Sequence, residues 1–211
     1  MKVISAFILI AMVISACSVL DTRSDYEQPQ YDVVDRIGEL VEIRNYGPRL
    51  AAEARVESAD DSEPATSPFK LLFDYISGGN RARENIAMTS PVERAAATQK
   101  IEMTVPVETV TREKNGAYMR FFLPRELNSE TVPAPADPRV RIVNVPAQTL
   151  AILRFSGLGD DKKVTAKKNE MLNALKDSEW RPVSEPVAYL YDPPWTLPFL
   201  RRNEVAVTVV R

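Results

Sequence analysis

The sequence contains no histidine, and this absence excludes much of the chemistry that proteins perform at their sites. Histidine is the commonest general base, the usual ligand of zinc and copper, and the usual axial ligand of haem iron. Cysteine is nearly absent too, because Cys17 is the only one among 211 residues, so no disulfide can form within the chain. The compartment must therefore be inferred from targeting signals.

The chain also lacks an excess of one charge. Its 27 basic and 29 acidic side chains are interspersed, and the net charge is −2. A balanced surface of this kind offers no field that would hold a polyanion, so nucleic acid is not an expected partner. With 45% hydrophobic residues, the chain is long enough to bury the core of one globular domain.

The first sixteen residues have the pattern of a signal peptide that ends in a lipidation motif. Lys2 supplies a positive start, and an apolar run broken only by Ser5 extends from Val3 to Ile14. This run is too short to span a bilayer of about 30 Å. It ends in Ile14-Ser15-Ala16-Cys17, which resembles a bacterial lipobox, in which the cysteine thiol receives a diglyceride before cleavage. An ordinary secretory signal with an incidental cysteine is the alternative.

A lipobox predicts a mature protein that begins at Cys17 and is anchored to a membrane by its acyl chains. Ser18 stands where an aspartate would resemble an inner-membrane retention signal, so we expect an exported protein on the periplasmic face of the outer membrane. Residues 17–34 lack apolar periodicity and are expected to form a lipid-anchored tether. Residues 35–211 then form the folded domain.

Apolar periodicity and turn residues predict the elements of this domain. Residues 39–57 alternate around Asn45-Tyr46-Gly47-Pro48, which predicts an antiparallel hairpin. Ser67-Pro68 and Gly78-Gly79 bound a helix over residues 68–77. A second helix and five further strands are expected at residues 161–176 and at residues 117–123, 139–145, 149–155, 187–191 and 204–210.

The order of these elements predicts the fold class. Strands flank a helix once in each half of the chain, and the proline-rich stretch at residues 133–138 is a stiff connector between the halves. Two similar halves of this kind favour an α+β fold over alternating β-α-β units. We therefore expect a distorted antiparallel β-barrel with two outer α-helices.

A rare pattern occurs twice, as Ile86-Ala87-Met88-Thr89-Ser90-Pro91-Val92 and as Ile101-Glu102-Met103-Thr104-Val105-Pro106-Val107. Other motifs accompany it in a fixed order: Tyr75-Ile76-Ser77-Gly78-Gly79-Asn80, Phe121-Phe122-Leu123-Pro124, Pro133-Ala134-Pro135, Arg154-Phe155-Ser156-Gly157, Tyr191-Asp192-Pro193-Pro194-Trp195 and Arg201-Arg202-Asn203-Glu204-Val205. Together they resemble the SOUL haem-binding family over residues 34–211, and the chain looks like a bacterial lipoprotein member of it.

The resemblance implies the barrel fold shared with gyrase-inhibitor-like effector-binding proteins, and non-enzymatic binding or carriage of haem or a related tetrapyrrole. In the family, haem lies against the apolar face of the first helix, and side chains from nearby loops meet its propionates. Carried over to this sequence, the ligand-binding residues are Phe69, Leu72, Phe73, Ile76, Met88, Met103, Trp195 and Thr196, and the candidate propionate contacts are Arg81, Arg83, Arg201 and Arg202.

Haem iron cannot be held by histidine in this chain. The remaining residues of a type that can bind haem iron are Met88, Met103, Met119, Tyr75 and Tyr191. The family also binds haem without a protein ligand to the iron. We expect this last mode, with exchangeable haem and no metal site. The alternatives are a binder of another apolar small molecule, a tetrapyrrole-modifying enzyme, for which no catalytic constellation stands out, and a purely structural role.

Each candidate residue also has a structural interpretation. The apolar stripe of the first helix is typical of a core-facing side, and methionines such as Met88 commonly fill gaps in a core. Arg201 and Arg202 beside Glu204 are typical of an ion pair at a strand entrance. Only the positions of these side chains in the fold decide between the interpretations.

Overall fold

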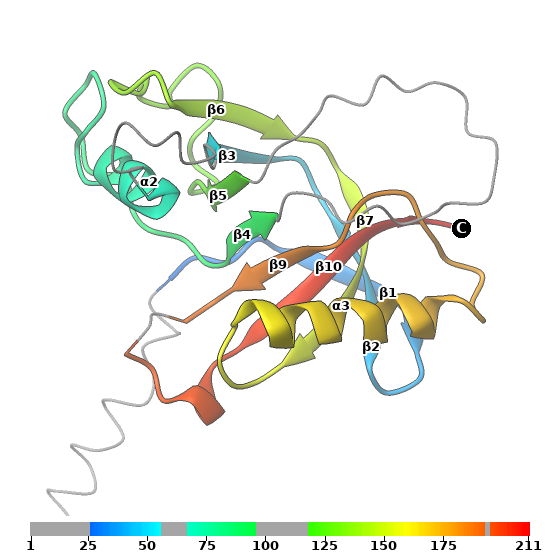
Figure 1. Ribbon diagram of the computed structural model, residues 1–211. Helices are drawn as coiled ribbons and strands as arrows, with labels where there is room; N and C mark the ends of the chain where they lie inside the picture. The colour runs from blue at the N-terminus through cyan, green and yellow to red at the C-terminus, as the bar shows by residue number, and fades with distance from the viewer. Residues whose placement is uncertain (1–25, 56–66, 96–117, 193–194) are drawn as a thin grey trace, which may run out of the picture.

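The structure, a computed structural model, describes residues 26–55, 67–95, 118–192 and 195–211 (Figure 1). In these ranges, ten strands form one curled antiparallel sheet, and two α-helices pack against it. The predicted α+β arrangement is confirmed. The signal peptide at residues 1–16, the lipidation residue Cys17, most of the expected tether and the second repeat, which contains Met103, lie outside the described residues.

The elements follow the predicted order closely. Both predicted helices and the five predicted strands are present, each within two residues of its expected bounds. In chain order the elements are β1 (Tyr31–Ile37), β2 (Val41–Tyr46), β3 (Arg49–Arg55), α2 (Pro68–Ile76), β4 (Val92–Ala95), β5 (Tyr118–Phe122), β6 (Val140–Val145), β7 (Gln148–Phe155), α3 (Asp161–Leu175), β8 (Arg181–Pro182), β9 (Val187–Leu190), the short 3-10 helix η1 (Pro198–Leu200) and β10 (Asn203–Val210).

The strand order shows how the two halves are interlocked. It runs β1-β2-β7-β10-β9-β4-β5-β3-β6, with β8 paired to β10. Strands β3, β5 and β4 form one three-stranded unit, β7, β10 and β9 form an equivalent one, and β4 joins β9 at the centre. One strand of each half crosses to the other half, because β2 pairs with β7 and β6 pairs with β3. The two similar halves are thereby confirmed.

The predicted hairpin over residues 39–57 is wrong. Its two strands exist, but β2 pairs with β1 and β7, whereas β3 pairs with β5 and β6. The chain changes direction at Gly47-Pro48, and Pro48 has no N–H with which to extend a ladder. The alternation of apolar and polar residues identified the strands correctly, but it carries no information on pairing, and β7, β5 and β6 lie far away in the sequence.

The folded domain also begins earlier than residue 35, because β1 starts at Tyr31, inside the expected tether of residues 17–34. This strand lies at the edge of the sheet and has no fully buried residue, so it lacks the apolar alternation by which a strand is identified. Its Asp35 accepts a hydrogen bond of 2.7 Å from the indole nitrogen of Trp180, which fixes β1 to the segment after α3.

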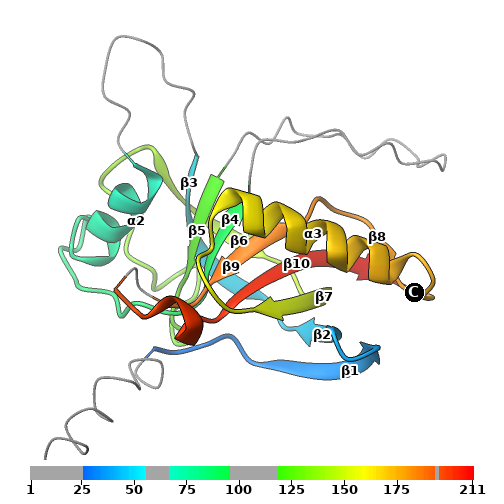
Figure 2. The same ribbon diagram turned by 60° about the horizontal axis from the view of Figure 1, so that its bottom comes forward.

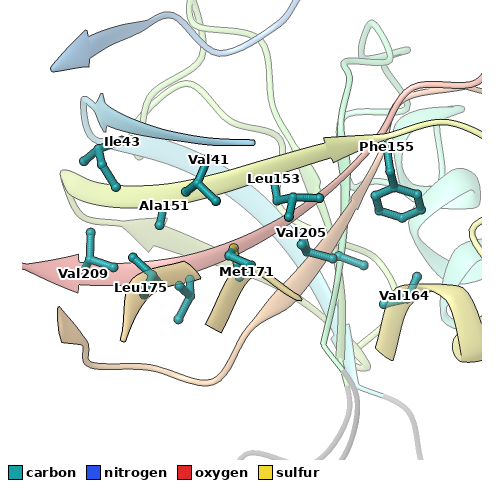
Figure 3. Close-up of a cluster of buried hydrophobic side chains, with 12 residues drawn as sticks. Val41, Ile43, Ala151, Leu153, Phe155, Val164, Met171, Leu175, Val205 and Val209 are labelled. Atoms are coloured by element: carbon teal, nitrogen blue, oxygen red, sulfur yellow. The ribbon is translucent and has the colours of Figure 1, made fainter. Parts of the chain in front are cut away.

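Helix α3 covers the half of the sheet that contains β7 and β10 (Figure 2). Its Val164, Met171 and Leu175 are buried against apolar side chains of the sheet. Figure 3 shows Leu153 of β7 and Val205 of β10 among the side chains that meet this helix. Asp160 begins the helix by accepting a hydrogen bond of 2.9 Å from the Lys163 N–H, as expected of an N-cap.

Helix α2 covers the other half, over β3, β5 and β6. Its buried residues are Leu71, Leu72, Tyr75 and Ile76. The Tyr75 hydroxyl donates a hydrogen bond of 2.8 Å to the carbonyl of Pro133, which ties the helix to the connector between the halves. The helix ends at the predicted glycines, and Gly79 approaches the Asp74 carbonyl so closely that a Cβ would lie 2.6 Å from its oxygen.

The face of the sheet opposite the helices is the interior of the barrel. Tyr46 of β2 and Val145 of β6 belong to one buried cluster, although these strands stand near opposite ends of the strand order. Arg49 of β3 likewise donates a hydrogen bond of 3.0 Å to Gln148 of β7. The sheet therefore curls around this face as a half-barrel, and both helices lie outside it.

Two substitutions on α2 separate core from surface on a single helix. We expect Leu72→Ala to lower the free energy of unfolding by about 2–5 kcal/mol, because Leu72 is fully buried and its loss leaves a cavity. Phe73→Ala, where the side chain is 46% exposed, should cost about 1 kcal/mol or less. Denaturant unfolding of both variants measures the difference, and equal losses would contradict the orientation of the helix.

Candidate functional site

The apolar stripe predicted on the first helix divides into a buried part and an exposed part. Leu72 and Ile76 face the sheet and are 0% and 5% exposed, whereas Phe69 and Phe73 are 42% and 46% exposed. The two phenylalanine rings are stacked, with centroids 6.1 Å apart and planes within 10° of parallel. Phe69 also meets Phe121 edge-on at 5.4 Å. We call Phe69 and Phe73 the aromatic ledge.

The loop after α2 brings two candidate propionate contacts near the end of this helix. The side-chain amide of Asn80 donates hydrogen bonds of 3.2 Å to the Tyr75 carbonyl and 2.6 Å to the Glu84 carbonyl, so the loop is held against the helix. Arg81 and Arg83 extend from this loop and are exposed. Arg83 has a φ of 56°, a conformation that side chains other than glycine adopt rarely.

The surroundings of Met88 favour a role in the core over a role in ligand binding. It is half-buried and packs against the core cluster beneath α2. The neighbouring Thr89 donates a hydrogen bond to the Phe122 carbonyl, and the Ser90 hydroxyl donates one of 3.3 Å to the Tyr191 carbonyl. The first copy of the repeated motif therefore joins strands of both halves at one end of the barrel.

The remaining candidates form a second group in the segment between β9 and β10. Trp195 is 76% exposed, and the Arg201 Nε donates a hydrogen bond of 2.8 Å to the Thr196 carbonyl. Arg202 forms an ion pair of 2.7 Å with Glu204, as the structural interpretation expects. In Figures 1 and 2, η1 within this segment lies apart from α2. The structure thus distributes the predicted site residues over two places.

A network of charged side chains lies inside the barrel. The sequence motifs do not indicate it as a unit. Glu204 is 0% exposed, and its carboxylate accepts hydrogen bonds of 3.2 Å from Arg44, 2.7 Å from Arg202 and 2.8 Å from the Tyr191 hydroxyl. Burial acts to lower the pKa of Arg44, but Glu204, Tyr46 and Glu42 together raise this pKa above its usual range. A fully buried carboxylate is thereby neutralised.

The first half contains a second network on the same face. Arg120 of β5 lies 2.6 Å from Glu53 and 3.0 Å from Glu93, and both carboxylates are nearly buried. Glu93 also accepts a hydrogen bond of 2.8 Å from the Tyr118 hydroxyl. Glu93 stands opposite Tyr189 in the sheet, and Tyr189 stands opposite Glu204, so the two networks form one row across the strands. Paired charges and aromatic rings fill this part of the barrel.

Four buried tyrosines and the half-buried Tyr118 have raised pKa values. Burial raises the pKa of Tyr75 to about 12. Burial, reinforced by a nearby glutamate, raises the pKa of Tyr118, Tyr189 and Tyr191 beyond its usual range, with Glu93 acting on the first two and Glu204 on the third. Burial is also the main cause of the raised pKa of Tyr46. These phenols stay protonated at neutral pH, and those of Tyr75, Tyr118 and Tyr191 donate hydrogen bonds.

A cleft of about 800 Å³ opens at the mouth of the barrel. Arg49 lies beside it, with its guanidinium 4.6 Å from the ring centres of both Tyr46 and Phe122. Of the predicted site residues that the structure describes, none lines this cleft. Its walls come from the segment that leads into β1, the link between β2 and β3, the loop before β4, and the end of β5 with the segment after it. They include Glu27, Gln28, Tyr31, Asp32, Arg49, Leu50, Thr89, Phe122, Leu123, Arg125 and Leu127.

Two kinds of feature are absent from the described ranges. No group of three or more cysteine, aspartate or glutamate side chains there could hold a metal ion. None of the helices in those ranges is long and apolar enough to cross a membrane.

The sequence matches the family described as SOUL heme-binding protein over residues 26–208, and the chain belongs to this family. This match covers most of the chain and confirms the resemblance carried by the motifs. No curated protein matches the chain.

Solved structures show the same fold at low sequence identity. The EcmrR C-terminal domain is similar with a TM-score of 0.54 and 12% identity, over 86% of this chain and 98% of that one. EcmrR in its complex with DNA is similar with a TM-score of 0.54 and 11% identity, over 100% of this chain and 69% of that one. An uncharacterized conserved protein from Listeria innocua is similar with a TM-score of 0.50 and 10% identity, over 89% of this chain and 94% of that one. At these identities the likeness shows the fold alone.

The buried tyrosines predict a loss of stability in alkaline solution. Their pKa values are raised in the folded protein above the unfolded value of about 10, so their contribution is complete below that pH and is lost as the pH rises towards the folded values. We expect the free energy of unfolding to fall progressively above about pH 10. Phenolate absorbance should show five of the seven tyrosines ionising only as the protein unfolds. Ionisation of all seven in the folded protein would contradict the burial.

Proposed function

We propose that this protein binds haem or a related tetrapyrrole without modifying it, at the aromatic ledge of α2. The observation that carries the proposal is the pair of stacked, nearly parallel rings of Phe69 and Phe73, which remain more than two-fifths exposed while Leu72 and Ile76 of the same apolar stripe are buried. Paired aromatic surface left open to solvent on a folded domain is costly unless a ligand or partner uses it. Membership of a haem-binding family supports a tetrapyrrole as that ligand.

The residues around the ledge fit a porphyrin. A flat macrocycle can pack on phenylalanine rings through apolar contact and offset stacking. The exposed Arg81 and Arg83 extend from the loop that Asn80 holds at the end of the same helix. Guanidinium groups form strong, often bidentate hydrogen bonds with carboxylates, so these two residues would hold the propionates. Bound haem would bring its iron, for which this surface offers no histidine.

The tyrosines that could serve as iron ligands are already engaged. Tyr75 donates its hydroxyl proton to the Pro133 carbonyl, and Tyr191 donates to Glu204. Burial raises the pKa of both phenols, which disfavours the tyrosinate that would bind iron. Binding through apolar contact and propionate pairing is therefore the mode we propose. Such haem exchanges readily, which suits carriage rather than catalysis.

The arrangement of charges supports a binder rather than an enzyme. The carboxylates with the lowest exposure are Glu53, Glu93 and Glu204, and each of them is paired with arginine. A general acid or base needs a titrating group that can reach the substrate. These carboxylates instead neutralise buried arginines in the interior of the barrel.

The cleft at the mouth of the barrel supports a second candidate, the binding of another apolar small molecule. Its volume of about 800 Å³ is within the usual range for small-molecule sites. Tyr31, Leu50 and Phe122 supply apolar and aromatic surface, and Arg49 could pair with an acidic group of the ligand. Phe69 and Phe73 do not line this cleft, so a ligand held there would be insensitive to substitutions at these two exposed residues of α2.

We further propose that the protein is exported and anchored by lipids on Cys17, at the periplasmic face of the outer membrane. The lipobox Ile14-Ser15-Ala16-Cys17 supports the anchor, and Ser18 supports the choice of membrane. Each acyl chain contributes about 0.8 kcal/mol per buried methylene, so several chains hold a protein firmly.

Hemin titration of the purified protein tests the ledge. Phe73→Asp should weaken binding by about tenfold or more, because a charge replaces half-exposed apolar surface at the ligand contact. The matched control is Leu40→Asp, which adds the same charge at a residue 58% exposed in the turn between β1 and β2. The Soret absorbance reports binding, and circular dichroism checks the fold.

Two outcomes would overturn the proposal. If the original protein binds hemin saturably and Phe73→Asp binds it with the same affinity, the haem site does not lie on α2. Nonspecific uptake with no saturable component would remove haem as a ligand of this protein, and would leave the second candidate to be tested by mass spectrometry of molecules extracted with the native protein.

A further inference from the structure

A second apolar surface lies at the end of the barrel from which β10 begins. Trp195 and Phe199 are 76% and 71% exposed, and Leu197 and Leu158 are each 51% exposed. Leu158 belongs to a different loop, but its neighbour Gly157 donates a backbone hydrogen bond of 2.8 Å to the Pro198 carbonyl. We call these four residues the apolar loop patch. Single exposed apolar side chains are ordinary, but four in adjoining loops indicate a binding surface.

The N-terminal segment of the described chain is held beside the two stems of this loop. The Glu27 carbonyl accepts a hydrogen bond of 2.9 Å from the Ser90 N–H, and the Ser90 hydroxyl donates to the carbonyl of Tyr191, just before the loop. Arg202, just after the loop, donates a hydrogen bond of 3.2 Å to the Gln28 side chain. The chain therefore enters the domain next to the patch.

The distance from this entry to the proposed anchor is short. Only eight residues separate Cys17 from Tyr26. Even fully extended, nine peptide steps reach about 30 Å. A lipid on Cys17 would thus hold this end of the barrel, rather than the turn between β1 and β2 or the far end of α3, close to the bilayer.

The charges around the patch suit a lipid surface. The Lys163 ammonium lies against Gly157, where an added Cβ would stand 2.4 Å from it. The nearby carboxylates are engaged, because Asp160 accepts from the Lys163 N–H and Asp161 pairs with Arg94 at 2.8 Å. Tryptophan beside basic side chains is typical of protein surfaces at the membrane interface, where the ring reaches the acyl boundary and the cation meets phosphates.

We infer that the apolar loop patch docks on the membrane surface and orients the barrel there. This inference rests on the proposed lipid anchor, which brings the patch to the bilayer, and it is independent of the haem site on α2. Trp195, Leu197 and Phe199 insert among the lipid headgroups, and the anchored protein is held at two points. A domain tied by its tether alone would instead rotate freely.

The two tryptophans of the chain allow a direct test. Trp180→Phe leaves Trp195 as the only tryptophan. Trp195→Phe leaves Trp180, whose indole N–H is hydrogen-bonded to Asp35 at the edge of the sheet. The protein is purified from cell membranes, mass spectrometry verifies the lipid on Cys17, and it is reconstituted into phosphatidylethanolamine and phosphatidylglycerol vesicles that contain brominated lipid. We expect strong quenching of Trp195 and little quenching of Trp180.

A pair of substitutions tests whether the apolar loop patch causes the quenching of Trp195. Adding Leu197→Ser and Phe199→Ser to the Trp180→Phe protein should return the quenching of Trp195 nearly to the Trp180 level. The control Leu40→Ser removes a comparably exposed leucine from a turn outside the patch and should change nothing. Without the anchor and the leader, as in protein that begins at Ser18, the same pair of serines should weaken vesicle partitioning by about tenfold or more.

Three results would overturn the inference. Equal and weak quenching of both tryptophans in anchored protein would show a barrel that does not dock. A blue shift of Trp195 that depends on protein concentration without lipid would assign the patch to a second copy of the chain. Loss of hemin affinity in the paired serine variant, with unchanged lipid quenching, would assign the loop to the ligand site. None of these results depends on whether Phe73→Asp weakens hemin binding.

Discussion

The fold depends on the neutralisation of one carboxylate that has no contact with water. Glu204 of β10 is fully buried inside the barrel, and a charge left unpaired there would cost about 3–5 kcal/mol. Its partners are Arg202, just before the same strand, and Arg44 of β2, which belongs to the other half of the chain. The ion pair with Arg44 can form only when β2 of the first half lies beside the strands of the second half. Strand exchange and charge neutralisation therefore require each other.

This interior leaves the outer surfaces for ligands. The row of glutamate, arginine and tyrosine side chains from Glu204 to Glu53 is paired across five strands, and a ligand there would have to replace those partners. On the outside, α2 has only nine residues yet carries six large apolar or aromatic ones. The sheet covers four of them, and Phe69 and Phe73 are left as a ledge. The proposed binding surface arises from this excess of apolar side chains on a short helix.

The sequence predicts the elements far better than their pairing. Helices α2 and α3 were predicted within one residue, since glycines, prolines and caps act locally. The hairpin at residues 39–57 was wrong, and β1 was missed, because strand pairing and edge strands depend on distant residues. On α2 the apolar pattern identified the stripe, but only packing separates the buried Leu72 from the exposed Phe73. The cleft had no sequence signal, because its walls come from four separate segments.

The central claim, that a tetrapyrrole binds outside the barrel on α2, is tested most directly by nuclear magnetic resonance with zinc protoporphyrin, a diamagnetic analogue of haem. Amide resonances of the labelled protein are followed during the titration. The account predicts that the largest shifts fall in α2 and in the loop that contains Arg81 and Arg83. Shifts concentrated at Gln30, Gly47 and Arg125 around the cleft, with α2 unchanged, would contradict it.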